Sequence, residues 1–138
     1  MRFFMSVVTM ALLSLNSTAN AACTDFSGDY NLKCYQEDGH LYDDETISLR
    51  QTGCEKLQWG EFTRNVDGNT WTHDFGDVQI FGTDIWNEDQ TFLKVQLKWQ
   101  QGTWFRTANG TISKLGDTVL QVLDWIDRGR TYCLLTPQ

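Results

Sequence analysis

Hydrophobic and polar residues alternate with a period of two along most of the chain, whereas helical periodicity is weak throughout. The clearest alternation is TFLKVQLKWQ (91–100), in which one face carries Leu93, Val95, Leu97 and Trp99. This pattern is typical of an antiparallel strand with one buried face. The turn dipeptide Gln101-Gly102 and the Thr- and aromatic-rich stretch 103–114 come next, which predicts a β-hairpin.

The same alternation predicts further strands at 28–36, 45–51, 54–64, 69–75, 77–82, 118–127 and 131–136. Tight turns such as Asp67-Gly68 join them in simple succession, so we predict an all-β, antiparallel up-and-down meander of about eight or nine strands. A flat sheet of this size would expose two edges, which favours closure into a barrel or a tight two-sheet sandwich. At most one turn of helix is expected within 81–90, with Asp84 as its cap.

Residues 1–21 have the composition of a secretory signal peptide. Arg2 supplies the positive charge, Phe3 to Leu15 form an apolar stretch too short to span a bilayer, and Ala19-Asn20-Ala21 is a small-residue cleavage site. The alternative is a buried N-terminal helix. We expect a mature chain of residues 22–138 that forms one domain and is secreted or periplasmic. Asn20 occupies the position where a lipoprotein signal needs an aliphatic residue, so no membrane anchor on Cys23 is expected.

An even number of cysteines in a short exported chain predicts disulfides. No C-x-x-C occurs and no histidine lies at zinc-like spacing from a cysteine, so no metal is expected. Three pairings are possible. In an up-and-down barrel whose last strand runs antiparallel to the first, the strand directions place Cys34 and Cys133 at one end and Cys23 and Cys54 at the other. The topology therefore predicts Cys34–Cys133 and Cys23–Cys54.

The charge balance narrows the class of partner. The chain carries 11 Lys and Arg against 18 Asp and Glu, and loss of Arg2 with the signal would leave a net charge of −8. Nucleic acids and anionic membrane surfaces attract basic proteins, so neither is an expected partner. A monomer is the expected state.

The stretch FSGDY (26–30) resembles the start of a lipocalin or another calycin barrel. Those families place a tryptophan where Tyr30 stands, and its ring closes one end of the barrel. The resemblance implies a calycin-like barrel in which Arg128 or Arg130 of the last strand crosses that ring. The chain is also similar in layout to small four-cysteine exported proteins of Gram-negative bacteria, with ISLRQTGC (47–54) as the second shared stretch. The resemblance implies a fold and names no ligand.

No catalytic or cofactor motif occurs in the sequence. His73 and Asp74 are adjacent strand residues that point to opposite faces, so they do not form an acid–base pair. Acidic clusters such as Asp43-Asp44-Glu45 are interpreted as solvated loop charges. We therefore expect neither an enzyme nor a cofactor.

Tryptophan is the one compositional excess, with six residues. The aromatic residues that we assign to the interior predict a site for a small apolar or amphipathic ligand, neutral or cationic, formed by Trp59, Trp71, His73, Phe75 and Trp99. The alternative is that these rings fill the core of a structural or protein-interaction module, such as an inhibitor or envelope accessory protein. A cavity open at one end favours the first hypothesis. A filled interior with an exposed apolar patch favours the second.

Overall fold

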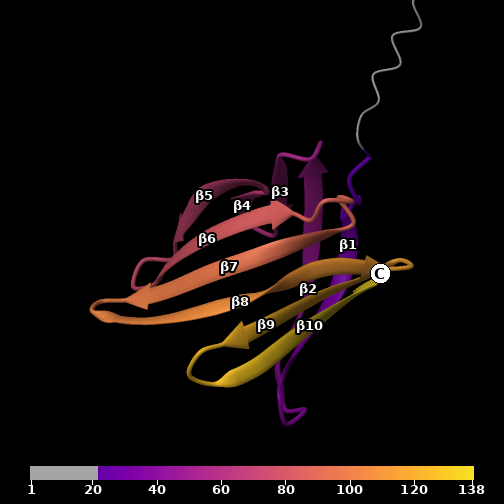
Figure 1. Ribbon diagram of the computed structural model, residues 1–138. Helices are drawn as coiled ribbons and strands as arrows, with labels where there is room; N and C mark the ends of the chain where they lie inside the picture. The colour runs from indigo at the N-terminus through magenta and orange to yellow at the C-terminus, as the bar shows by residue number, and fades with distance from the viewer. Residues whose placement is uncertain (1–21) are drawn as a thin grey trace, which may run out of the picture.

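The computed structural model describes residues 22–138, and these form an all-β fold in which no helix is assigned. None of the described residues forms a helix long and apolar enough to cross a membrane. The predicted signal peptide, residues 1–21, lies outside the described residues. The ten strands (Figure 1) are β1 (Gly28–Gln36), β2 (Leu41–Thr52), β3 (Lys56–Trp59), β4 (Phe62–Asn65), β5 (Asp67–Asp74), β6 (Gln79–Trp86), β7 (Phe92–Gln101), β8 (Trp104–Leu115), β9 (Thr118–Trp125) and β10 (Gly129–Pro137).

The strands form one antiparallel sheet that curls into a nearly closed barrel. The strand order in the sheet is β4-β3-β2-β1-β10-β9-β8-β7-β6-β5. Strands that lie side by side are therefore consecutive in the sequence, except for the pair β1 and β10. The first and last strands pair from Tyr30↔Pro137 to Gln36↔Thr131, as the meander predicts. Strands β4 and β5 are the two edges of the sheet, and the seam between them is packed by side chains instead of a backbone ladder.

Three details of the sequence prediction are wrong. The expected strand at 54–64 is two strands, because Gly60 turns the chain with a φ of 60°. Asp67-Gly68 is no hairpin turn, since β5 starts at Asp67 and pairs with β6 through a bulge. The segment 81–90 contains most of β6 and a turn instead of helix, and Asp84 is a buried strand residue. The division of 54–64 into β3 and β4 brings the count from the expected eight or nine strands to ten.

Both predicted cysteine pairs are disulfides in the structure, with Cys23 joined to Cys54 and Cys34 joined to Cys133. Cys34 and Cys133 are direct partners in the β1–β10 ladder, so this bond fastens the first strand to the last. Two disulfides fit an oxidising, extracytoplasmic compartment.

One end of the barrel, which we call the sealed end, is closed by the segment that precedes β1. Phe26 is fully buried there and stacks on Trp86 with 5.7 Å between ring centroids. The Tyr30 hydroxyl donates to the Phe26 carbonyl over 3.0 Å, so Tyr30 occupies a buried position near this end. The expectation that Arg128 or Arg130 crosses the Tyr30 ring is wrong. Arg128 precedes β10 and Arg130 lies near its start, so both are at the end of the barrel opposite Tyr30. Arg130 forms an ion pair with Asp124 instead.

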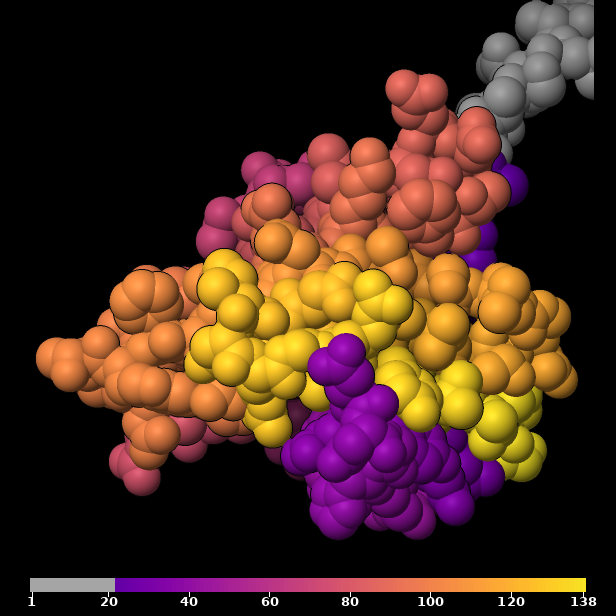
Figure 2. All heavy atoms as spheres, turned by 60° about the horizontal axis from the view of Figure 1, so that its bottom comes forward, coloured from indigo at the N-terminus to yellow at the C-terminus, as the bar shows by residue number. Residues whose placement is uncertain are grey.

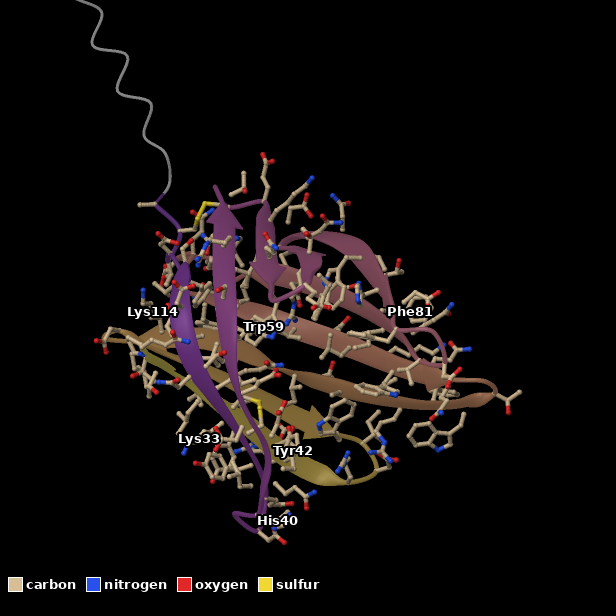
Figure 3. All side chains as sticks on the ribbon, turned by 180° about the vertical axis from the view of Figure 1, so that it is seen from behind. Lys33, His40, Tyr42, Trp59, Phe81 and Lys114 are labelled. Carbon is tan, nitrogen blue, oxygen red and sulfur yellow. A yellow bond between two sulfur atoms is a disulfide. The ribbon has the colours of Figure 1, made fainter. Side chains whose placement is uncertain are left out.

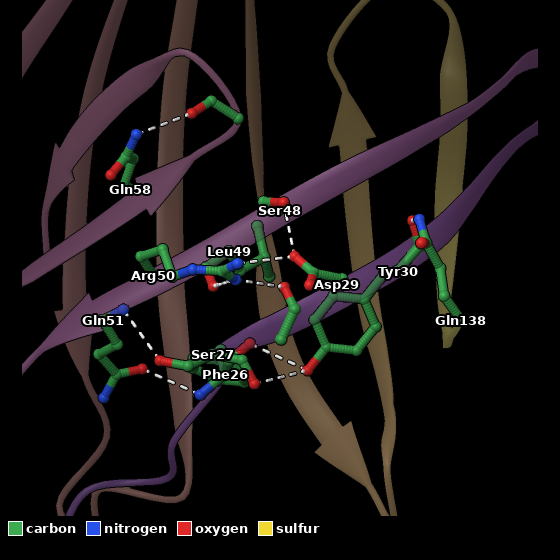
Figure 4. A network of polar contacts seen from close by, with 12 residues as sticks. Phe26, Ser27, Asp29, Tyr30, Ser48, Leu49, Arg50, Gln51, Gln58 and Gln138 are labelled. Carbon is green, nitrogen blue, oxygen red and sulfur yellow. Dashed lines mark hydrogen bonds and ion pairs between the residues drawn. The ribbon is translucent and has the colours of Figure 1, made fainter.

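A polar network on the surface beside the sealed end joins β1 to β2 (Figure 4). Asp29 accepts hydrogen bonds from Ser48 over 2.6 Å and from Arg50 over 2.8 Å. The Ser48 hydroxyl, followed by Arg50, holds the pKa of Asp29 below its ordinary value of 3.8. The backbone N–H of Ser27 has the same effect on the pKa of Asp25.

We expect stability to fall as the pH drops through the acid range. Carboxyl groups with lowered folded pKa values contribute stability above their unfolded pKa, and that contribution is lost as the pH falls through the folded pKa. Asp67 and Asp124 share the lowered pKa of Asp25 and Asp29. Thermal unfolding followed by circular dichroism should give a lower Tm at pH 2.5 than at pH 6, and Asp29→Asn should reduce the difference. An equal Tm at both pH values would contradict this account.

Candidate functional site: the inner face at the end opposite the seal

Inward-facing side chains form successive rows across the strands, and their exposure rises from the sealed end to the other. The row through Asp84 and Val95 is buried. The next row towards the opposite end, through Trp71, Gly82, Leu97 and Ala108, is buried except at Leu97, which is half-buried. In the outermost row, His73, Ile80, Trp99 and Arg106, every residue reaches solvent. Along β5–β8 the inner wall is therefore most exposed to solvent at this end.

A buried ion pair fills the barrel inside the outermost row. Arg64 Nε and Nη2 donate to the two carboxylate oxygens of Asp84 over 2.8 and 2.9 Å, and both side chains are almost completely buried. The Trp71 indole donates to the same carboxylate over 2.8 Å. The Arg64 guanidinium lies over the rings of Trp59 and Trp71, 5.4 and 4.9 Å from their centroids. This cluster, which we call the buried layer, closes the interior with its own side chains.

Two of the five predicted ligand residues belong to this buried layer. Trp59 is 8% exposed and lies inside the barrel (Figure 3), and Trp71 is 4% exposed. The Trp71 ring lies directly on Gly82, where an added Cβ would come within 2.1 Å of it. Both indoles are thus held by Arg64 and by the packing around them. Both side chains therefore belong to the buried core of the barrel.

The other predicted residues lie at the end opposite the seal, with Phe62 of β4 as their common neighbour. The Phe62 ring is 5.0 Å from His73 and 6.0 Å from Phe75, and it also stacks on Trp71 at 5.6 Å. His73 and Phe75 meet edge to face at 4.3 Å. These contacts close the seam between β4 and β5. Phe75 remains 52% exposed.

Trp99 and Arg106 complete this surface on β7 and β8. Trp99 is separated from His73 by one strand, through Ile80, and is 37% exposed. Arg106 pairs with Trp99, and its Nε lies 3.4 Å from an Asp127 carboxylate oxygen. Neighbouring strands are about 5 Å apart, so His73 and Trp99 are about 10 Å apart across the wall. We call Phe62, His73, Phe75, Trp99 and Arg106 the inner rim.

The rim is exposed because the β7–β8 hairpin extends past its neighbour. The pairing of β8 with β9 covers only Ala108 to Leu115, whereas β8 itself starts at Trp104. Residues 104–107 of β8 therefore extend beyond the end of β9. Figure 2 shows this hairpin projecting from the body of the molecule. Trp104, Phe105 and Ile126 at the same end are also exposed. The end opposite the seal therefore carries most of the large apolar side chains that solvent reaches.

Sequence reasoning missed four residues of this region, namely Arg64, Asp84, Phe62 and Arg106. A signal existed for Asp84, which has the parity of Gly82 and Trp86 on β6 and is thus a charged residue at an inward position. Such a group needs a buried partner.

The Asp74 carboxylate accepts a hydrogen bond from the Gly76 N–H, away from His73, so Asp74 and His73 form no acid–base pair. Within residues 22–138 no cluster of three metal-ligating side chains occurs.

Comparison of the chain with protein-family models, with curated proteins and with solved structures found no match in any of the three.

Proposed function

We propose that the protein is an exported, non-enzymatic binding barrel that takes a small apolar or amphipathic ligand on its inner rim. The observation that carries this proposal is the gradient of exposure along the inner wall of β5–β8: the rows through Asp84 and Trp71 are almost entirely buried, whereas every residue of the row through His73 and Trp99 reaches solvent. The rim combines aromatic faces with two polar groups, His73 and Arg106. Sites for small molecules commonly combine these properties. The disulfides and the signal-like segment 1–21 support export.

Because of the buried layer, the proposed ligand site is the inner rim and not the deep interior of the barrel. A ligand deep in the barrel would have to displace the Arg64–Asp84 pair, which is costly because both charges are buried. The rim avoids that cost, since its rings are already partly in water. The buried Tyr30 beside the sealed end supports the proposal of a calycin-like barrel, since it stands where that family places a tryptophan.

Retinol and oleate are suitable first probes, because one is cyclic and the other extended. Titration should quench tryptophan emission and give a saturating curve. Trp99→Ala should weaken binding at least tenfold, equivalent to about 1.4 kcal/mol. Phe105→Ala is the matched control, since Phe105 is an exposed ring on the outer face of the same hairpin. Loss of affinity in both variants alike, or no saturable quenching with either probe, would refute the proposal.

A second candidate function is a protein-interaction module, such as an inhibitor or envelope accessory protein. The filled interior and the exposed apolar residues Trp104, Phe105 and Ile126 favour it. The probe titration separates the two candidates. An intact, disulfide-bonded protein that binds neither probe leaves the interaction module as the better hypothesis.

A further inference from the structure

The outer face of the sheet carries a groove of about 370 Å³ across β5–β8. This volume is within the range of about 300–1,000 Å³ found for small-molecule sites. The side chains that line it belong to neighbouring cross-strand rows that point away from the barrel interior, as Phe81 does in Figure 3. One row contains Thr83, Gln96 and Asn109, and the next contains Phe81, Lys98 and Thr107.

The groove presents two side-chain amides, those of Gln96 and Asn109, that are not hydrogen-bonded within the described part of the protein. Each amide offers two donors and an acceptor, and the Thr107 hydroxyl offers both functions, whereas the Thr83 hydroxyl already lies 3.5 Å from that of Thr70. A ligand that is itself rich in hydroxyl groups can satisfy such a set. An apolar ligand would cover these groups and leave them unpaired.

Lys98 gives the groove its charge. It is the only charged side chain among the residues that line the groove, and no carboxylate does so. Its ammonium lies 5.8 Å from the centroid of Phe81 and 4.9 Å from that of Phe105, which fixes it by cation–π contacts. In a chain with a net charge of −7, this groove is a local exception to the acidic surface.

We propose that the outer groove binds an acidic saccharide. Lys98 pairs with the carboxylate of a sugar acid, Gln96 and Asn109 hydrogen-bond its ring hydroxyls, and Phe81 packs against the C–H face of the ring. The groove and the inner rim lie on opposite faces of the sheet, so either site can exist without the other.

Isothermal titration calorimetry with trigalacturonate as the acidic probe and maltotriose as a neutral one tests this assignment. Trigalacturonate should bind with a dissociation constant below about 1 mM. Lys98→Met should weaken its binding at least tenfold, and Asn109→Ala should weaken it several-fold. The affinity for trigalacturonate should decrease with added salt, because salt screens the electrostatic contact between Lys98 and the carboxylate.

Lys94→Met is the matched control, since Lys94 is an exposed lysine on the same face of β7 that does not line the groove. It should leave trigalacturonate binding unchanged. No heat with either sugar, equal affinity for both sugars, or an equal loss in the Lys94 and Lys98 variants would each overturn the proposal. The retinol titration reports on the inner rim separately, so failure at one site is distinguishable from failure at the other.

Discussion

Replacement of Asp84 by alanine is expected to destabilise the protein by about 3–5 kcal/mol, because it leaves the Arg64 guanidinium buried without its counter-ion. The substitution also removes the acceptor of the Trp71 indole. Urea unfolding followed by tryptophan emission measures the change. Asp124→Ala is the matched control, since it breaks an ion pair with Arg130 that is exposed to solvent and should therefore change stability far less.

The double variant Arg64→Met/Asp84→Leu separates the charge effect from simple loss of packing. Apolar replacement of a whole buried ion pair is often neutral or stabilising. The double variant should therefore recover most of the stability that Asp84→Ala loses. A loss of less than about 1 kcal/mol in Asp84→Ala would show that the pair is not closed off from water as the structure has it.

Removal of the Cys34–Cys133 disulfide is expected to cost about 5 kcal/mol, the larger of the two disulfide effects. The two cysteines are 99 residues apart in sequence, so the bond constrains nearly the whole described chain when it is unfolded. Cys23–Cys54 spans 31 residues and should contribute about 4 kcal/mol on the same reasoning.

Paired alanine variants, measured by chemical denaturation, test this order. Cys34→Ala/Cys133→Ala should unfold at the lower denaturant concentration, because β1 and β10 are then held by their backbone ladder and packing alone. Equal stability of the two double variants would contradict the expected order, and a greater loss on removing Cys23–Cys54 would mean that the sealed end and not the β1–β10 junction dominates.

Alternation of polar and apolar residues was enough to predict the all-β class, the 91–114 hairpin and the pairing of the cysteines. The cysteine pairing followed because strand direction in a meander fixes which end of the barrel each residue reaches. The same alternation merged β3 with β4, since Leu57, Trp59 and Phe62 read as one apolar strand unless the turn at Gly60 is recognised.

The candidate site was harder to predict than the fold. Arg64 and Asp84 lie on strands that are not neighbours in the sheet and meet only across the interior, which no local pattern encodes. The inward direction of Trp99 was predictable from its parity. Its exposure was not, because it depends on how far β7 and β8 extend beyond Trp125 at the end of β9. Trp59 and Trp71 were expected to line a site because nothing in the sequence shows that Arg64 occupies the space between them.

The central claim is that the buried layer confines ligand contacts to the inner rim, and the indole region of a ¹H–¹⁵N correlation spectrum tests it most directly. Each of the six tryptophans contributes one indole N–H signal, which single Trp→Phe variants assign. Saturation with retinol should shift the Trp99 signal and leave those of Trp59 and Trp71 in place. Shifts of Trp59 and Trp71 as large as that of Trp99 would contradict the account, as would no shift of Trp99 at saturation.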